Sequence, residues 1–288
     1  MRVVLVTCTT WPELSASDRL YAEALERRGV STAAAPWNGP PDPFVGADLV
    51  VLRSNWDYHH DLASFTAWLD ALERAETRVL NAPSLVRWNL EKRYLLDLER
   101  RGVRVPQTEV VQGDPTAVAS VLARHGWAEA VVKPLVGASG HGVRLVRSGE
   151  SLAAESIAAV PGMVVVQEYL PEVAQSGEVS YVFFDAEYSH AVLKRPAPGD
   201  FRVNSDYQGT IEPFEPDASL VRQARAVLDV LDEIPLYARV DGVTRDGALL
   251  VTELELNEPS LSLALAPGSA ARFADATVQR LRPDSLRG

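Results

Sequence analysis

Cysteine is nearly absent from this chain of 288 residues, because Cys8 is the only one. A single cysteine cannot form a disulfide within the chain, so the sequence favours a reducing compartment such as the cytoplasm. No basic partner that would activate a nucleophilic thiol is evident, and we interpret Cys8 as a small buried apolar residue. The N-terminus also lacks the basic flank, long apolar stretch and cleavage site of a signal peptide, which supports a cytoplasmic location.

Long hydrophobic runs and an excess of basic residues are missing too. The longest apolar runs, such as 49–52 and 164–166, have the length of a strand and are too short to span a membrane. The formal net charge of −11 argues against a nucleic-acid partner, because neutralising a phosphate backbone needs a basic surface. A nucleotide such as ATP is not excluded, since it needs only a few local cations and usually magnesium. We therefore expect neither a membrane nor a nucleic acid as partner.

Alternating strand and helix patterns predict three α/β units. Residues 1–85 alternate apolar strands with helices such as 62–74, as in a small parallel sheet. Residues 86–168 begin with a helix near 89–101 and continue as short strands around a second helix. The remaining residues, 169–288, consist mainly of paired strands, and clefts between such units are common ligand sites. The turns of these strand pairs are predicted at residues 185–186 and in TRDG, residues 244–247.

The glycine-rich stretch GASGHG, residues 137–142, closely follows the apolar strand AVVKP. Glycine permits a positive φ and a close approach of the backbone, so the amides of such a loop can face phosphate oxygens. Its order differs from the dinucleotide and P-loop patterns, and a strand rather than a helix follows it. A flexible surface hairpin is the alternative. Lys133 in the preceding strand is costly to bury without an anion, which favours a loop that covers a bound phosphate.

Oxygen-bearing side chains near the C-terminus predict a metal site. In ELELNEP, Glu253, Glu255 and Asn257 share one face of a predicted strand, because successive side chains of a strand alternate. Arg239 and Asp241 share a face of the preceding strand in the same way. Carboxylate and amide oxygens are ligands that Mg²⁺ prefers, whereas a solvated sheet face with a surface ion pair is the alternative. The apolar runs of both strands and the poor strand-forming tendency of Asn257 favour the metal.

Three further features carry weaker signals. QEYL, residues 167–170, ends an apolar strand before Glu178. Such a strand end can bind an adenine edge and such a carboxylate a ribose, with a plain loop as the alternative. Arg53 in RSNWDY follows a buried strand, where it would clamp a substrate carboxylate or serve equally well as a structural arginine at a domain interface. His59 and His60 lack a third spaced ligand, so we interpret them as loop residues.

In order and spacing over residues 86–260, these motifs resemble the ATP-grasp enzymes, in the branch with glutathione synthetase, ribosomal-protein glutamate ligases and D-alanine–D-alanine ligase. RSNWDY, AVLKRPAPGDFRVN and ELELNEPSL are similar, more narrowly, to glutathione-synthetase-like amino-acid ligases, with the cyclo-ligase of cycloserine biosynthesis as the nearest characterised type. The resemblance implies an α/β (α+β) ATP-grasp fold, in which a small N-terminal α/β domain precedes two lobes that hold ATP between them. The corresponding domains are residues 1–85, 86–168 and 169–288. The matching pieces are Lys92 in NLEKRYLL, Lys133 with GASGHG, QEYL with Glu178, RVD at 239–241 and ELN at 255–257.

The resemblance also implies a role for each matching residue. The ATP-binding residues would be Lys92, Lys133, Ser139, Gly140 and Gly142 at the phosphates, Gln167, Glu168, Tyr169 and Leu170 at the adenine, and Glu178 at the ribose. The magnesium ligands would be Asp241, Glu255 and Asn257. The catalytic residues, which neutralise an acyl phosphate and its leaving phosphate, would be Arg239 and Arg202. The substrate-binding residues would be Arg53, Asn204 and Arg239. Because Glu253 and Glu258 flank the metal ligands, the ligand register can shift along the strand.

We therefore expect an ADP-forming carboxylate–amine ligase that uses ATP and Mg²⁺ and acts on a small amino acid. Isolated arginines suit a small zwitterion, and no basic or apolar docking segment for a peptide is evident. The amine would come from the same molecule by cyclisation, or from a second amino acid as in a dipeptide or glutathione-like ligase. A non-catalytic ATP-binding regulator and a kinase with a stable product are the alternatives. The substrate and the oligomeric state, a homo-oligomer included, stay open.

Overall fold

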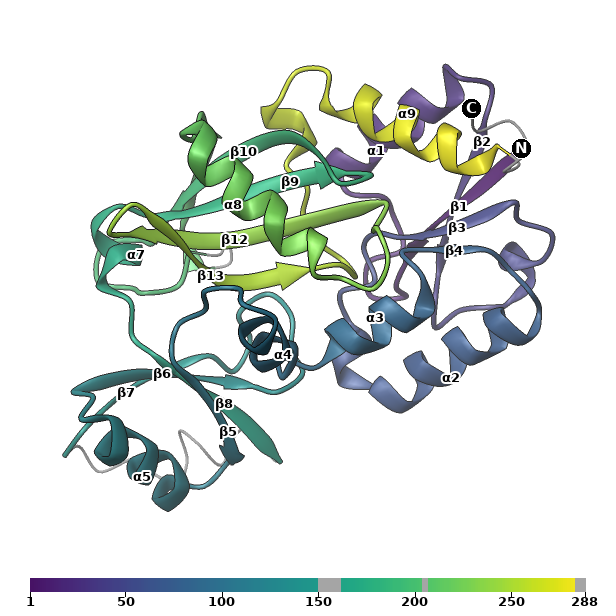
Figure 1. The fold of residues 1–288 in the computed structure, drawn as a ribbon. Helices are drawn as coiled ribbons and strands as arrows, with labels where there is room; N and C mark the ends of the chain where they lie inside the picture. Colours follow the sequence, from purple (N-terminus) through teal and green to yellow (C-terminus); the bar gives the residue numbers. More distant parts are fainter. Residues whose placement is uncertain (150–161, 204–206, 283–288) are drawn as a thin grey trace.

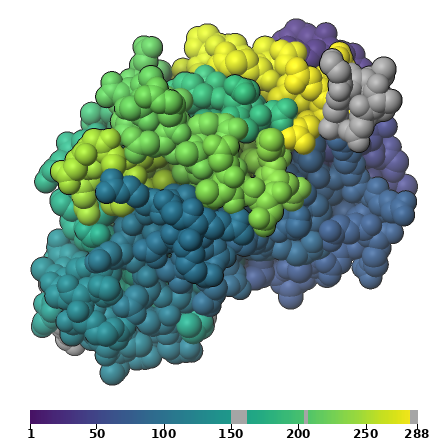
Figure 2. Space-filling view, in the orientation of Figure 1, coloured from purple at the N-terminus to yellow at the C-terminus, as the bar shows by residue number. Residues whose placement is uncertain are grey.

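Three β-sheets and their helices make up the computed structural model, which describes residues 1–149, 162–203 and 207–282 (Figure 1). This mixed α/β architecture confirms the predicted fold class. The unit built on the central part of the chain projects from the rest of the molecule, at the lower left of the space-filling view (Figure 2). Within the described segments, no helix is long and apolar enough to cross a membrane.

The N-terminal sheet is parallel and carries helices on both faces. Its strands, in spatial order, are β2 (Ser31–Pro36), β1 (Arg2–Thr7), β3 (Leu49–Leu52) and β4 (Val79–Leu80), and its helical segments are α1 (Ala16–Glu26), η1 (Asp42–Phe44), η2 (Tyr58–His60) and α2 (Leu62–Arg74). Leu5 of β1 packs in the core with α1, and its neighbour Val6 packs with α2 on the opposite face. Central strands covered on both faces are apolar throughout, which explains their unbroken hydrophobic runs.

The central sheet is antiparallel and is covered by one helix. Its strands, in spatial order, are β5 (Thr108–Gln112), β8 (Met163–Glu168), β6 (Glu129–Pro134) and β7 (Arg144–Arg147), and the helix is α5 (Pro115–His125). Ala130 and Val132 of β6 pack in the core with α5. Because side chains alternate along a strand, Val131 and Lys133 are directed to the opposite face. The predicted strand, loop and strand around GASGHG are therefore confirmed.

The C-terminal sheet has five antiparallel strands. In spatial order they are β11 (Thr210–Phe214), β10 (Glu187–Arg195), β9 (Glu178–Phe184), β12 (Tyr237–Arg245) and β13 (Ala248–Glu255), accompanied by α7 (Pro171–Gln175) and α8 (Ala218–Asp229). The turn between β9 and β10 places Asp185 and Ala186 at positive φ, and the turn between β12 and β13 does the same with Asp246 and Gly247. Both turns lie where they were predicted.

The predicted single helix at 89–101 is wrong. The chain forms two helices there, α3 (Pro83–Leu90) and α4 (Tyr94–Arg100). Between them the backbone N–H of Lys92 donates to Leu135 O at 2.8 Å, a contact with the segment directly after β6 that replaces a bond within a helix. Tyr94 and Leu98 of α4 belong to the same hydrophobic core as the C-terminal sheet. The segment around Lys92 therefore joins two sheets.

The last described helix, α9 (Ser269–Leu281), was not predicted, and it returns to the N-terminal unit (Figure 1). Tyr21 of α1 stacks on Phe273 with ring centroids 3.8 Å apart, and its hydroxyl lies 2.7 Å from Thr277 Oγ1. On the rim of the same contact, Arg28 forms an ion pair with Asp275 at 2.7 Å. The C-terminal helix thus packs against the first unit and connects it with the third. The domain boundaries at residues 85 and 168 stay predictions.

Candidate active site

A cavity of about 620 Å³ is lined by the central sheet, the C-terminal sheet and loops of the N-terminal unit. This volume lies within the range of small-molecule sites in proteins. The chain contains only three lysines, Lys92, Lys133 and Lys194, and all three line this cavity. Apart from five histidines, arginine supplies every other basic side chain. Because a lysine ammonium is a compact charge that binds phosphate oxygens, their concentration here identifies the cavity as a candidate anion site.

Two of the lysines are neutralised by carboxylates of the cavity wall. Lys92 Nζ lies 2.8 Å from Glu253 Oε1 and also donates to Gly137 O at 3.2 Å. Burial acts to lower the pKa of Lys92, but Glu253 outweighs it and raises this pKa above its usual value. Lys194 Nζ lies 2.8 Å from Asp241 Oδ2. Both ammonium groups are therefore held in place by carboxylates.

Lys133 is held differently, by a neutral partner. Its Nζ donates to Gln167 Oε1 at 2.7 Å, and Gln167 Nε2 donates in turn to Thr108 Oγ1 at 3.0 Å. Among the described residues no carboxylate forms an ion pair with Lys133. Burial lowers its pKa, because the charged form loses hydration without gaining a close counter-charge. An anion that enters the cavity would therefore find a lysine that is positioned but not neutralised.

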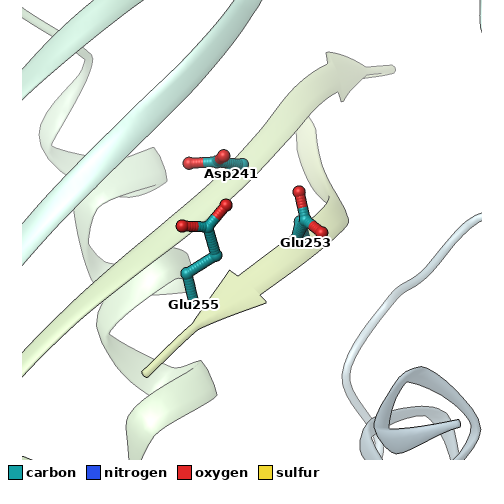
Figure 3. A group of neighbouring side chains, drawn as sticks. All are labelled: Asp241, Glu253 and Glu255. Atoms are coloured by element: carbon teal, nitrogen blue, oxygen red, sulfur yellow. The ribbon is translucent and has the colours of Figure 1, made fainter. Parts of the chain in front are cut away.

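Three carboxylates meet on one face of the C-terminal sheet (Figure 3). Asp241 on β12 lies directly across from Glu253 on β13, and Glu255 follows two residues later on the same face. One oxygen from each of the three lies within 4.8 Å of the others. This spacing and the oxygen ligands suit a hard divalent cation such as Mg²⁺. The structure thus brings the predicted ligands Asp241 and Glu255 together, with Glu253 as a third member.

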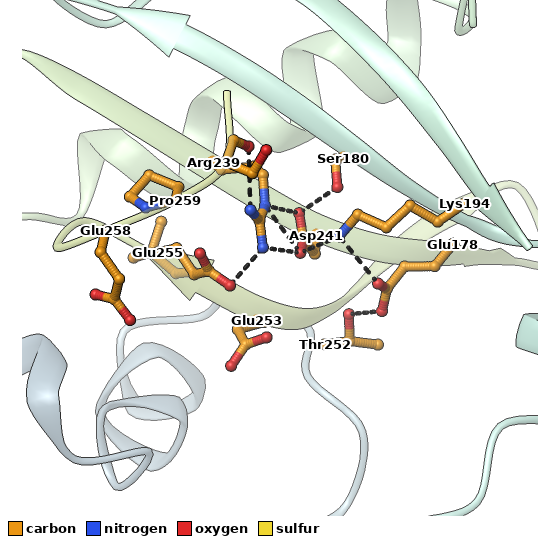
Figure 4. Close-up of polar contacts among 12 residues, drawn as sticks. Glu178, Ser180, Lys194, Arg239, Asp241, Thr252, Glu253, Glu255, Glu258 and Pro259 are labelled. Atoms are coloured by element: carbon orange, nitrogen blue, oxygen red, sulfur yellow. Dashed lines mark hydrogen bonds and ion pairs between the residues drawn. The ribbon is translucent and has the colours of Figure 1, made fainter. Parts of the chain in front are cut away.

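Arg239 links this carboxylate group to the chain that follows β13 (Figure 4). Its Nε donates to Asp241 Oδ1 at 2.9 Å, its Nη2 donates to Asp241 Oδ2 at 3.0 Å and also to Glu255, and its Nη1 donates to Ser260 O at 3.1 Å. Ser180 Oγ adds a bond to Asp241 Oδ1 at 2.6 Å. The guanidinium is nearly buried, so its geometry is fixed by the wall of the cavity.

The carboxylates of the cavity differ in how strongly they favour the ionised form. Burial acts to raise the pKa of Asp241, but Arg239 and Lys194 hold it well below its usual range. Burial raises the pKa of Glu255 to about 7, since Glu253 and Asp241 oppose the influence of Arg239. Burial and then the neighbouring charge of Glu255 raise the pKa of Glu258 to about 8. A cation beside Glu255 and Glu258 would favour their ionised forms and lower both pKa values.

The glycine-rich loop and the end of β8 border the opposite side. Residues 137–141 line the cavity, with Ser139 and Gly140 at positive φ, and Gly142, also at positive φ, follows them. Residues 167–170 line it as well, and Glu168 is held by Arg245 at 2.8 Å. The predicted ATP-binding residues in these two segments thus lie at one cavity, with Lys92, Lys133 and Glu178 beside them.

Besides Gly142, two predicted residues lie outside the lining of the cavity. Asn257 is buried, and its Oδ1 accepts a hydrogen bond from Asn55 Nδ2 at 3.0 Å. Arg53 is also buried, with Nε 2.8 Å from Asp18 Oδ1 and Nη2 2.7 Å from Pro259 O. These contacts match the structural role at a domain interface that the sequence left open for Arg53.

The segment DFRVN is described only in part. Arg202 lines the cavity, with its guanidinium 3.5 Å from the centre of the Tyr207 ring and an ion pair to Asp200 at 2.8 Å. Tyr207 in turn donates to Gly140 O at 3.3 Å, which connects Arg202 to the glycine-rich loop. Asn204, predicted to bind substrate, lies outside the described residues.

Sequence reasoning overlooked several residues of the site. Lys194 stands in the apolar strand VLK as Lys133 does in VVK, so the same cost of burial would have identified it. Trp11 and Trp56 line the cavity from the ends of β1 and β3, with ring centroids 5.5 Å apart. Trp56 stands within RSNWDY, which was interpreted only through Arg53, and no motif marks Trp11. Their role depends on how the N-terminal sheet meets the other two, which a single sequence does not reveal.

Comparison with known families assigns both parts of the chain. Residues 3–81 match the family described as "D-cycloserine synthetase DcsG, N-terminal domain", and residues 94–238 match "Prokaryotic glutathione synthetase, ATP-grasp domain". The chain is 34% identical over 277 residues to the cycloserine biosynthesis protein DcsG of Streptomyces lavendulae, covering 91% of this chain and 92% of that protein. It is 28% identical over 274 residues to the glutathione synthetase of Parasynechococcus marenigrum, covering 88% and 85%.

Solved structures agree with these relatives. The crystal structure of D-cycloserine synthetase DcsG matches with a TM-score of 0.87 at 32% identity, over 98% of this chain and 100% of that one. The D-alanine–D-alanine ligase of Bacillus anthracis has the same fold, with a TM-score of 0.69 at 18% identity over 98% and 97%. The ATP-grasp fold and the resemblance predicted from the sequence are confirmed, while the roles of individual site residues stay predictions.

Proposed function

The chain belongs to the ATP-grasp ligases of the prokaryotic glutathione synthetase family, and we propose that it activates the carboxyl group of one small amino acid with ATP and closes that molecule into a ring. As a member of this family it is an ADP-forming ligase. One observation carries the proposal: side chains suited to bind phosphate and side chains suited to bind a metal line a single cavity. The remaining wall of this cavity comes from the N-terminal unit, which matches the N-terminal domain of D-cycloserine synthetase. Ring closure is accordingly the first candidate for the bond formed.

ATP would lie with its phosphates between the glycine-rich loop and the three lysines. Lys133 has a neutral partner only, so a phosphate would supply the counter-charge that burial demands. Lys92 donates to Gly137 O and thereby ties the glycine-rich loop to the carboxylate side of the cavity. The adenine would lie against residues 167–170, where the strand end offers backbone groups to a base edge. Glu178, fixed by Thr252 at 2.6 Å, would accept the ribose hydroxyls.

The carboxylate group fits a magnesium ion. Asp241, Glu253 and Glu255 bring one oxygen each within 4.8 Å of the others, and hard oxygen ligands are those that Mg²⁺ binds. We place Asp241 and Glu255 as direct ligands, and Glu253, which already holds Lys92, as the neighbour that orients that lysine. Asn257 would complete the set by releasing Asn55. When bound, magnesium supplies neutralisation of the phosphate charge during transfer.

The transfer itself needs positioning and a fixed positive charge. An oxygen of the substrate carboxylate attacks the γ-phosphorus, the bond to the bridging oxygen breaks and ADP leaves. A side-chain amine of the same molecule then attacks the carbonyl carbon. A C–N bond forms, the C–O bond to the phosphate breaks so that phosphate leaves, and the nitrogen loses one proton. Arg239 would face the phosphate oxygens and the developing oxyanion, because two carboxylates and Ser260 O hold its guanidinium rigidly. Arg202 would approach with the glycine-rich loop, to which Tyr207 connects it.

A second candidate is a ligase that joins two amino acids, which the likeness to glutathione synthetase favours. Both candidates are tested by measuring ADP release with single amino acids, their O- and N-substituted analogues, and pairwise mixtures. Ring closure predicts ADP release with one compound alone and a product lighter than that compound by one water. Joining of two different amino acids predicts release only with pairs. Stimulation by peptides or folded proteins alone would overturn the small-substrate proposal.

A further inference from the structure

One carboxylate of the cavity has no cationic partner. Glu258 lines the cavity, yet among the described residues no lysine, arginine or histidine forms an ion pair with it. In Figure 4 its carboxylate lies to one side of the Arg239 network, with no drawn contact to it. The other carboxylates that line the cavity each have a cation: Glu168 has Arg245, Glu178 and Asp241 have Lys194, Glu253 has Lys92, and Glu255 has Arg239.

Aromatic side chains surround Glu258 from the N-terminal unit. Trp56 Nε1 donates to Glu258 O at 3.1 Å, which fixes the backbone at this position. Trp11 packs edge-on against Trp56, and it is half exposed although its ring lines the cavity. Tyr58 lines the same cavity as Glu258, and burial and then the charge of Glu258 raise the pKa of its phenol. An unpaired carboxylate thus stands in an aromatic corner.

From this arrangement we infer that Glu258, with Trp11, Trp56 and Tyr58, forms the subsite for the α-ammonium group of the substrate, the one that does not take part in ring closure. This inference rests on the proposed function, since it assigns one end of the same substrate. A carboxylate would form a charge-assisted hydrogen bond with the ammonium group. The faces of tryptophan and tyrosine attract organic cations and would exclude water from the pair. The four residues are therefore specificity-determining for a free amino acid.

The position of this corner also orients the substrate. Glu258 follows Glu255 by three residues and lines the same cavity, and Glu255 is held by Arg239. A substrate ammonium at Glu258 would leave the carboxyl group of the same small molecule free to face Arg239 and the phosphates. Mg²⁺ is a poorer occupant of the corner, because it prefers several oxygen ligands and keeps its waters, whereas the walls here are aromatic. The carboxylates that suit Mg²⁺ are those grouped at Asp241.

The decisive variant is Glu258→Gln, which keeps the shape of the side chain and removes its charge. The control is Glu187→Gln, the same change at an exposed position of β10 away from the cavity. The amino acid that gives the strongest ADP release is compared with its α-hydroxy acid, in which hydroxyl replaces ammonium. For Glu258→Gln we expect the KM of the amino acid to rise about tenfold to a hundredfold, the usual effect of losing a charged hydrogen bond. ADP affinity should stay at the wild-type value in both variants.

The preference for amine over hydroxyl gives the discriminating readout. Wild type and Glu187→Gln should prefer the amino acid, and Glu258→Gln should lose that preference. An undiminished preference in Glu258→Gln, with normal folding, overturns the subsite while leaving the proposed function intact. If no amino acid releases ADP, the proposed function fails, and the subsite is then judged by the effect of ethanolamine and of ethylene glycol on tryptophan fluorescence. Quenching by ethanolamine alone that disappears in Glu258→Gln retains the subsite, and its absence overturns it.

Discussion

Two buried polar regions flank the chain that follows β13, and they differ in whether their charges are paired one to one. The first is the seam between the N-terminal unit and this segment, where Arg53 Nε lies 2.8 Å from Asp18 Oδ1 and Ser54 Oγ donates to Asp18 Oδ2 at 2.8 Å. Arg53 Nη2 reaches Pro259 O at 2.7 Å, and the guanidinium lies 5.0 Å from the centre of the Tyr237 ring. One cation and one anion thus neutralise each other in a closed pair.

The second region is the wall of the cavity, where the charges are not paired one to one. Asp241 is shared by Arg239, Lys194 and Ser180, whereas Lys133 has an amide for a partner. Glu258 has no cation among the described residues. Burial raises the pKa of Glu255 to about 7, although Arg239 acts to lower it.

The comparison separates structural charge from functional charge. A closed ion pair gains no stability from a ligand. Removing one member of the pair should therefore reduce the free energy of unfolding and leave ligand binding intact. An open network is stabilised when a ligand supplies the counter-charge that it lacks. Removing one residue of the network should therefore reduce binding or turnover and leave stability nearly unchanged. Three substitutions of charged residues test this distinction, and a fourth, Trp11→Leu, probes the edge of the open network. For Arg53 the sequence allowed either kind of role.

The largest effect is expected for Arg53→Met in the seam. It leaves Asp18 as a buried carboxylate without a cation, and the free energy of unfolding should fall by about 3–5 kcal/mol. Denaturant unfolding measures this loss, and the double variant Arg53→Met with Asp18→Asn should recover part of it because no unpaired charge remains. Unchanged stability together with a raised substrate KM would instead make Arg53 the substrate clamp that the sequence allowed.

The second effect concerns Glu255→Gln in the cavity. The change keeps the shape but removes a charged metal ligand, so turnover should fall about a hundredfold and recover partly at raised magnesium concentration. The free energy of unfolding should not fall, because one of three crowded carboxylates has lost its charge. Glu253→Gln is the matched variant, with a smaller loss expected through Lys92. The opposite ranking of the two variants would show that the ligand register is shifted along β13.

The third effect concerns Lys133→Met, which keeps much of the apolar stem and deletes the charge. ATP affinity measured by calorimetry should fall about tenfold or more, while stability stays unchanged or rises because a buried charge has been removed. Amine acylation gives an independent check in the wild type, since every lysine of the chain lines the cavity. ATP with magnesium should protect Lys133 and leave the exposed N-terminal Met1 amine reactive. Equal labelling with and without ATP, or wild-type affinity in the variant, would remove Lys133 from the nucleotide site.

Local patterns predicted the elements that local forces decide. The helix 62–74 has the predicted bounds because its apolar spacing and its Asp61 cap agree, and the turn at residues 185–186 follows from its place between two apolar runs. The helix at 89–101 was mispredicted because a tertiary contact interrupts it, through the bond from Lys92 to Leu135 O. Sequence periodicity carries no record of such a contact.

The site was predictable at positions where burying a charged side chain costs free energy unless a ligand is bound. Lys133 in an apolar strand and the neighbouring Glu253 and Glu255 on one face of a strand were enough to suggest a ligand site. The ion pair from Lys92 to Glu253 and the aromatic corner at Glu258 join segments far apart in the chain, so only the fold reveals them. The seam and the cavity wall also looked alike in sequence, because an arginine after a buried strand is compatible with either.

The smallest effect is expected for Trp11→Leu, at the edge of the aromatic corner. Trp11 is 51% exposed, so its loss should hardly change the free energy of unfolding. If it shields an ammonium group at Glu258, the KM of the amino-acid substrate should rise about two- to fivefold, as expected for one exposed cation–π contact. ADP affinity should remain at the wild-type value, since the tryptophan lies at the carboxylate end of the cavity. The matching α-hydroxy acid should be affected much less, because it has no cation to lose. A similar loss for both compounds would mean that Trp11 provides apolar contact alone, and that the recognition of charge in this corner belongs to the carboxylate.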